Sequence, residues 1–230
     1  MNTIQVLQKI FKNPEGELLM FDDLSVLNIY EKDEGKYYIK AISKLDEEKQ
    51  VYNEKTGKSA PEEIVRQLYL VELTKKYKYP KNLIELEKHV NFGREIKRAD
   101  IVVYRPDGIT PKIIIEVKAP SEDNDVQQLK SYLNAEGAPV GVAINGKTRL
   151  ILYRPYPKDF DDTLDDIPAS DEEVEDVLAK RKTLQDLKEK DLKETIKTLE
   201  ELVLANSGAD SFDEIFKLIY AKLYDEKEAL

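Results

Sequence analysis

Two acidic residues and one lysine have the types and the spacing of a metal-assisted hydrolytic site. Glu116 and Lys118 are two apart in the run IIIEVK, and side chains two apart on a strand point to the same face. Asp100 lies in the preceding run KRADIVVY, so antiparallel pairing of the two strands would bring its carboxylate toward Glu116. Hard divalent cations prefer carboxylate oxygens, and a nearby lysine can position water or neutralise a phosphate. The three residues therefore predict metal-assisted cleavage of a phosphodiester.

The competing interpretation is an exposed ion pair, because the Glu and Lys of an isolated Glu-x-Lys on a strand usually lie on a solvent-exposed face. Glu116 argues against it, because an unpaired carboxylate within the run IIIEV is costly to bury and a metal ion would compensate its charge. The chain has no cysteine and one histidine, which excludes thiolate sites. We expect that histidine, His89, to be a packed or edge residue.

Hydrophobic periodicity predicts the elements that must position these residues, in the order helix, three strands, helix, two strands. Pro61 suits the first turn of the first helix, and Asn145-Gly146 is a favoured hairpin pair. The fold class is therefore α/β, with a mixed sheet flanked by helices and followed by an all-helical connector. The expected helices are 61–77 and 122–136, and the expected strands are 84–92, KRADIVVY from Lys97, 112–118, 139–145 and 149–154.

Composition divides the chain further. We expect an N-terminal extension packed on the core (1–60), with a short helix, strands at 24–31 and 36–43, and a polar turn region at 46–60. The core covers 61–155, a Pro- and Asp-rich linker 156–170, and a helical connector 171–230. No apolar run is long enough to span a membrane and no signal peptide is recognisable, so we expect a cytoplasmic protein.

The net charge of −10 is unexpected for a protein that binds nucleic acid. The charge is unevenly distributed, however. Residues 1–60 have a net charge of −2, residues 61–155 of +3, and residues 156–230 of −11. A nucleic-acid site is therefore best accommodated in the middle of the chain.

Asp100 followed by Glu116-Val117-Lys118, on successive strands after a helix, resembles the PD-(D/E)xK nuclease pattern, although Ala99 replaces the usual proline. The segments PEEIVRQ (61–67), KRADIVVY, IIIEVKAP and INGKTR resemble the N-terminal nuclease domain of type I restriction enzyme R subunits. Gln128 and Tyr132 match the Q-x-x-x-Y element of RecB-like nucleases. The resemblance covers roughly residues 60–155 and implies a restriction-endonuclease-like fold.

The resemblance also implies roles for individual residues. Asp100 and Glu116 would bind Mg²⁺, with Mn²⁺ as a substitute, and Lys118 would be the catalytic lysine. Glu63 would be the additional acid near the metal, with Glu62 as its neighbour and possible substitute. Gln128 and Tyr132, four apart on one helix face, would contact DNA or support the site. Arg66 and Gln67 are interpreted as helix surface.

The segment GVAINGKT (141–148) fits the phosphate-loop pattern, which works only where a helix follows the loop. The following run RLILYRP is typical of a strand, so we expect no ATP site in this chain.

The tail SFDEIFKLIYAKLYDEK (211–227) resembles the N-terminal helices of N6-adenine DNA methyltransferases, although its apolar stripe also suits an ordinary amphipathic helix. We therefore expect the N-terminal part of a fused restriction–methylation enzyme. Its partners would be double-stranded DNA, methyltransferase and target-recognition regions absent from this chain, and a second copy in a transient dimer on DNA. The alternatives are a non-catalytic DNA-binding or assembly module with the same fold, and a repair or RNA-processing nuclease.

Overall fold

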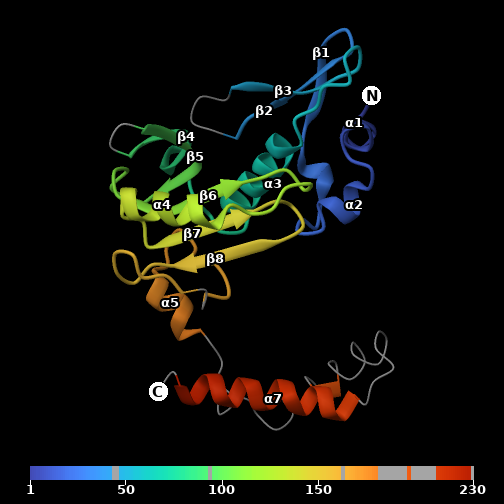
Figure 1. Cartoon of the computed structure of the whole chain (residues 1–230). Helices are drawn as coiled ribbons and strands as arrows, with labels where there is room; N and C mark the ends of the chain where they lie inside the picture. The colour runs from blue at the N-terminus through green and yellow to red at the C-terminus, as the bar shows by residue number, and fades with distance from the viewer. Residues whose placement is uncertain (43–46, 93–94, 162–163, 181–195, 198–210, 229–230) are drawn as a thin grey trace. The chain divides into compact units, whose positions relative to one another are not determined.

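The computed structural model describes residues 1–42, 47–92, 95–161, 164–180, 196–197 and 211–228. The chain divides into two compact units, Met1–Leu178 and Ala179–Leu230, and Figure 1 shows the elements of each. The first unit contains all the residues that we expected to carry chemistry.

A five-stranded sheet is the centre of the first unit, with strand order β4-β5-β6-β7-β8. The pairs are antiparallel except β6 with β7, so the predicted mixed α/β fold is confirmed. The turn of the β7–β8 hairpin contains Gly146, whose φ of +86° suits glycine. The strands are β4 (Ile84–Phe92), β5 (Glu95–Tyr104), β6 (Pro111–Val117), β7 (Val140–Ile144) and β8 (Arg149–Tyr153).

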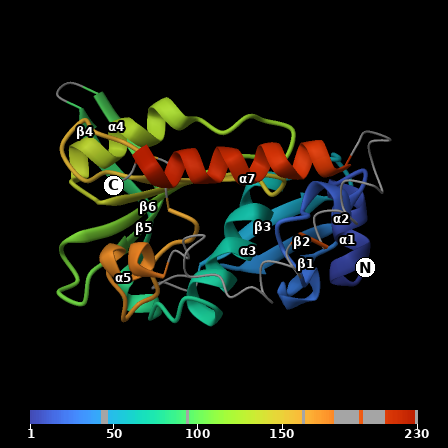
Figure 2. The same cartoon turned by 90° about the horizontal axis from the view of Figure 1, so that it is seen from below.

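Two helices cover opposite faces of this sheet (Figures 1 and 2). On β5, Ile101 and Val103 join the core under α3 (Pro61–Lys75), whereas Val102 joins the core under α4 (Val126–Glu136). This alternation is the period of a strand that is buried on both faces, which explains why the run is continuously apolar. The sheet therefore lies between two helical layers.

The N-terminal extension packs on the α3 side of the core, as Val6 of its first helix and Val51 of its third strand show. Its last strand, β3, occupies a segment that we expected to be a polar turn region. That expectation was wrong, because β3 pairs with β2 and buries Val51 and Tyr52. The elements are α1 (Thr3–Ile10), α2 (Pro14–Glu17), β1 (Ile29–Asp33), β2 (Lys36–Lys40) and β3 (Glu48–Asn53).

The segment after β8, expected to be a linker, contributes to the same core. Leu164 and Ile167 are buried there, and Tyr79 donates a 2.7 Å hydrogen bond to the carbonyl of Pro168. Helix α5 (Val174–Ala179) adds Val174 to the core. Apolar burial thus continues to the end of the first unit.

The second unit contains α7 (Ser211–Glu228), where we expected a helix. Most of the other predicted connector helix, 171–205, lies outside the described residues. Within the part of the chain that the structure describes, no helix is long and apolar enough to cross a membrane.

Candidate active site

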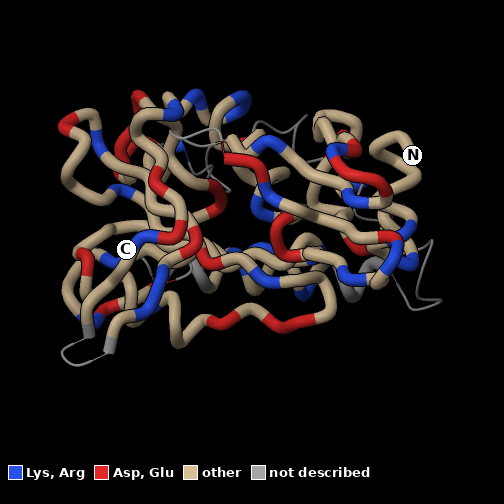
Figure 3. The backbone as a smooth tube through the Cα atoms, turned by 90° about the horizontal axis from the view of Figure 1, so that it is seen from above, with Lys and Arg blue, Asp and Glu red and all other residues tan. Residues whose placement is uncertain are grey.

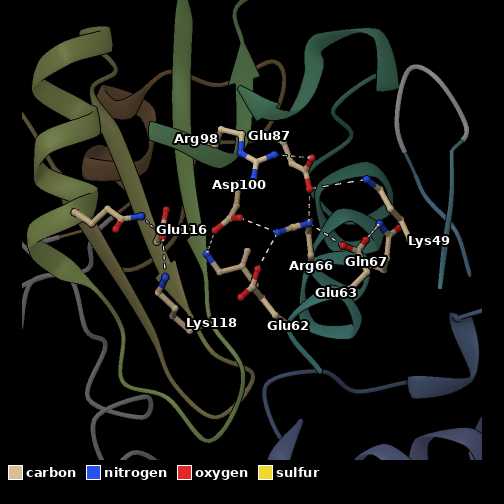
Figure 4. Close-up of polar contacts among 12 residues, drawn as sticks. Lys49, Glu62, Glu63, Arg66, Gln67, Glu87, Arg98, Asp100, Glu116 and Lys118 are labelled. Carbon is tan, nitrogen blue, oxygen red and sulfur yellow. Dashed lines mark hydrogen bonds and ion pairs between the residues drawn. The ribbon is translucent and has the colours of Figure 1, made fainter. Parts of the chain in front are cut away.

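Strands β5 and β6 bring Asp100 and Glu116 together. The strands pair antiparallel with Ile101 opposite Ile115, so the two acids lie one residue further along at the same level. Asp100 Oδ2 accepts a 2.8 Å hydrogen bond from the backbone N–H of Val117. This cross-strand bond fixes the Asp100 carboxylate beside the end of β6 (Figure 4), and the predicted antiparallel pairing is confirmed.

Glu116 is a buried carboxylate that is only partly compensated. Its side chain is 2% exposed, and Oε1 accepts bonds from Lys118 Nζ at 3.1 Å and from Gln128 Nε2 at 2.5 Å. Its other oxygen, Oε2, is buried without a hydrogen-bond partner among the described residues. Burial, and then the nearby charge of Asp100, raise the pKa of Glu116 to about 8. A carboxylate oxygen in this state is suited to receive a cation.

Lys118 points to the same side of β6 as Glu116, as the two-residue spacing predicted. Its side chain is 22% exposed, so the ammonium group can reach the cavity in front of the acids. Burial alone would lower the pKa of Lys118, but the contact with Glu116 and the charge of Asp100 outweigh it and raise that pKa. Lys118 is therefore a cation that can donate hydrogen bonds to water or phosphate.

Gln128 and Tyr132 lie on one face of α4, as their four-residue spacing predicted. Gln128 Nε2 lies 3.0 Å from the Tyr132 hydroxyl, which donates a 2.8 Å bond to the carbonyl of Arg98. Asp125 caps this helix by accepting from the backbone N–H of Gln128. The pair thus ties Glu116 on β6 to the strand that carries Asp100.

Arg66 lies at the centre of the acidic groups, and the interpretation of Arg66 and Gln67 as helix surface was wrong. One guanidinium nitrogen, Nη2, bonds Asp100 at 2.7 Å and Glu62 at 2.9 Å. The other, Nη1, bonds Glu63 at 2.7 Å. The three- and four-residue spacing of Glu63 and Glu62 from Arg66 on a helix was a sequence signal for these pairs. Gln67 is buried, and its amide is satisfied there: Nε2 donates to Glu63, and Oε1 accepts from the backbone N–H of Ile42.

A cavity of about 270 Å³ lies in front of these groups, and it separates the roles of the two glutamates on α3. Glu62 lines the cavity, whereas Glu63 does not and instead bonds Arg66 and Gln67. Burial, and then the charge of Asp100, raise the pKa of Glu62. Glu62 is thus the helix acid that faces Asp100, in the position we expected for Glu63. The cavity is lined by Glu62, Arg66, Glu87, Arg98, Asp100, Glu116, Lys118 and Gln128.

Glu87 and Arg98 complete the site, and sequence reasoning missed both. Glu87 has a φ of +52° in the middle of β4, a conformation that residues other than glycine rarely adopt. Its carboxylate lies 3.5 Å from Arg66, 3.7 Å from Arg98 and 3.8 Å from Lys49. The Arg98 side chain is 61% exposed at the cavity entrance. His89, on the same edge strand, is exposed, so the expected edge histidine is confirmed.

The donor chemistry of the site fits a hard divalent cation, although the acids are not arranged as a finished metal cage. Asp100 and Glu116 supply carboxylate oxygens, and Glu116 Oε2 is buried and has no hydrogen-bond partner in the described part of the chain. Among the described residues, no group of three acidic or histidine side chains stands ready to hold a metal ion. The reason is visible in Figure 4, where Arg66 stands between Asp100 and the acids of α3.

Basic and acidic positions are interspersed along the described part of the backbone in Figure 3, so the distribution of charge along the chain does not mark the site. The site is defined instead by its contacts.

Comparison with known families agrees with this location. Residues 61–168, slightly less than half of the chain, match the family described as type I restriction enzyme R protein N terminus (HSDR_N). Searches among curated proteins and among solved structures gave no match. Residues 61–168 are therefore similar to the N-terminal domain of type I restriction enzyme R proteins.

Proposed function

We propose that residues 61–168 form a Mg²⁺-dependent DNA endonuclease domain of a restriction system. The observation that carries this proposal is the buried Oε2 of Glu116, which lies beside Asp100 and Lys118 and has no hydrogen-bond partner within the residues that the structure describes. A merely structural ion pair has no use for an uncompensated carboxylate, whereas a cation site requires one. The family match supports the restriction context.

In this proposal Asp100 and Glu116 hold Mg²⁺, with Mn²⁺ as a substitute, and Glu62 rather than Glu63 supports them from α3. Bound Mg²⁺ supplies Lewis-acid activation of water and compensation of the charge that develops on the phosphate. Lys118 donates hydrogen bonds that orient the attacking water or the scissile phosphate. Gln128 holds Glu116 in place, and Tyr132 fixes the backbone at Arg98.

The substrate in this proposal is double-stranded DNA. The exposed Arg98 and the nearby Lys118 give the cavity entrance two cations that can contact phosphates on either side of the cleaved bond. The methyltransferase and target-recognition functions belong to other regions or subunits. Cutting both strands needs two sites, so we also propose a transient dimer on DNA. Sedimentation with a long duplex tests this, and strictly monomeric binding with single nicks would contradict it.

One observation favours a second candidate, a non-catalytic DNA-binding module. Arg66 already compensates Asp100 and Glu62, so part of the acid set is satisfied without a metal. Such a module would bind DNA but would not cleave it at any concentration of Mg²⁺ or Mn²⁺.

Nicking of supercoiled plasmid separates the two candidates. We expect Mg²⁺-dependent nicking by the full chain, and a rate about 10²–10⁴-fold lower for Lys118→Ala, the range for loss of a proton-transfer or positioning group. The matched control is Lys9→Ala, because Lys9 is exposed on α1 and does not line the cavity. Equal rates for Lys118→Ala and wild type would refute the assignment of Lys118, and DNA binding without any nicking would favour the module.

A further inference from the structure

We propose that Arg66 is an internal cation that holds Asp100 and Glu62 in the metal-free protein and that a divalent cation must displace. This inference rests on the proposed function, because it takes Asp100 as a metal ligand. It goes further by assigning Arg66 as a positioning residue that competes with the metal and thereby sets its affinity.

The two ends of the Arg66 guanidinium group face different acids. Nη2 contacts the cavity acids, Asp100 at 2.7 Å and Glu62 at 2.9 Å. Nη1 contacts Glu63 at 2.7 Å and Glu87 at 3.5 Å, and Glu63 lies outside the cavity lining. Arg66 therefore bridges the acids that would meet a metal and acids that can retain Arg66 without it.

In its present position Arg66 would repel a cation bound to Asp100. Asp100 uses Oδ1 for Arg66 and Oδ2 for the backbone N–H of Val117. A divalent cation on this carboxylate would lie within a few ångströms of the guanidinium group, where like charges repel strongly in a buried setting. Arg66 is only 7% exposed, so solvent screens that repulsion poorly.

Arg66 also has acidic partners that it can keep after it leaves Asp100. If Nη2 leaves Asp100, Nη1 can keep its bond to Glu63, and Glu87 remains within reach. Arg66 Nε is buried without a hydrogen-bond partner among the described residues, so the present position leaves one donor unsatisfied. A shift of the guanidinium group could therefore give Nε a hydrogen-bond partner while Nη1 keeps its bond to Glu63.

The inference predicts the direction in which the affinity for a divalent cation changes when Arg66 is removed. If Arg66 competes with the metal, its removal must tighten cation binding, by about tenfold or more, which corresponds to about 1.4 kcal/mol. If Arg66 instead shapes the acids for the metal, its removal must weaken binding. Arg66→Lys keeps the charge but cannot bridge both sets of acids, so we expect an intermediate affinity.

Isothermal titration calorimetry of the full chain with Mn²⁺ alone shows whether removal of Arg66 tightens or weakens cation binding. The proteins compared are wild type, Arg66→Gln, Arg66→Lys and a matched control, Arg149→Gln. The control removes another largely buried arginine, which bonds Tyr77 and Asp166 and does not line the cavity. We expect Arg66→Gln to bind Mn²⁺ at least tenfold more tightly than wild type and Arg149→Gln to bind like wild type. Binding by Arg66→Gln but not by wild type would support the inference equally.

Unchanged or weaker binding by folded Arg66→Gln, with binding retained in wild type, would overturn the inference and leave the proposed function intact. No binding by any variant would overturn both. Circular dichroism checks that Arg66→Gln folds. Should it not fold, crystals of wild type grown with Mn²⁺ give the answer: loss of the Arg66–Asp100 contact supports displacement, and a retained contact beside the bound ion refutes it.

Discussion

Two largely buried arginines of the first unit are surrounded by polar groups that are satisfied to different degrees. Arg149 bonds the Tyr77 hydroxyl at 3.0 Å and Asp166 at 3.3 Å, and Lys76 adds a second cation 3.3 Å from Asp166. We refer to these four residues as the closing cluster. Around Arg66, by contrast, five acids lie within or beside one cavity, and we refer to that group, with Lys118, as the site cluster. Its acids are Glu62, Glu63, Glu87, Asp100 and Glu116.

Asp166 of the closing cluster and Glu116 of the site cluster have opposite pKa shifts. Burial would raise the pKa of Asp166, but the Tyr77 hydroxyl and Arg149 outweigh it and lower that pKa. Glu116 is buried more deeply and has too few partners, so its pKa rises to about 8. Both oxygens of Asp166 have partners, whereas Oε2 of Glu116 has none among the described residues. Complete compensation suits a cluster that stabilises the fold, whereas a surplus of acid is what the proposed cation site requires.

Arg149→Gln should have the largest effect on stability and none on the proposed chemistry. It removes the charged partner of Asp166 and Tyr77, and we expect the free energy of unfolding to fall by about 1–3 kcal/mol. Urea denaturation measures this loss. The nicking rate per folded molecule should stay at the wild-type value, and a large drop in that rate would show that the two clusters are not independent.

Glu116→Gln should have the opposite effect on stability in the absence of metal. An acid whose pKa is raised on folding costs stability once the pH exceeds its ordinary pKa of 4.5, and the cost grows until about pH 8. We expect Glu116→Gln to be more stable than wild type by about 1–2 kcal/mol at pH 8, with the difference vanishing near pH 5. Denaturation at both pH values in EDTA tests this, and a destabilised variant at pH 8 would mean that Glu116 is fully compensated.

Tyr132→Phe should have the smallest effect. The change removes the hydroxyl that donates to the carbonyl of Arg98 and leaves the ring in the core under α4. We expect a loss of about 0.5–1.5 kcal/mol in the free energy of unfolding and a modest decrease in nicking. Leu133→Ala, on the same helix and equally buried, is the comparison for a change in packing alone. A loss above about 3 kcal/mol for Tyr132→Phe would point to a larger structural role for the hydroxyl.

The sequence predicted the parts of the site that depend on strand geometry. Alternation along IIIEVK placed Glu116 beside Lys118, and the antiparallel order of β5 and β6 placed Asp100 within reach, because both follow from local periodicity. The four-residue spacing of Gln128 and Tyr132 predicted their shared face for the same reason. The confirmed hairpin at Asn145-Gly146 depended on turn chemistry.

The parts that were missed depend on tertiary contacts or on backbone geometry that local sequence patterns do not show. Two adjacent glutamates on α3 cannot be ranked by periodicity, and the cavity distinguishes Glu62 from Glu63. Arg66 is buried only because acids from three elements converge on it, which no local pattern reveals. Glu87 depends on a backbone distortion in β4, and its residue type gave no signal for a positive φ. Strand β3 was missed because Val51 and Tyr52 are its only apolar residues.

The most direct test of the account is the change in melting temperature that Mn²⁺ produces in wild type, Asp100→Asn and Arg149→Gln. If the site cluster is a cation site, Mn²⁺ at about a hundred times its Kd should raise the Tm of wild type and of Arg149→Gln by roughly 5–10 °C. Asp100→Asn should show almost no increase, because it loses a ligand. An equal increase in Asp100→Asn and wild type, or no increase in any of the three proteins, would contradict the assignment of the site cluster as a metal site.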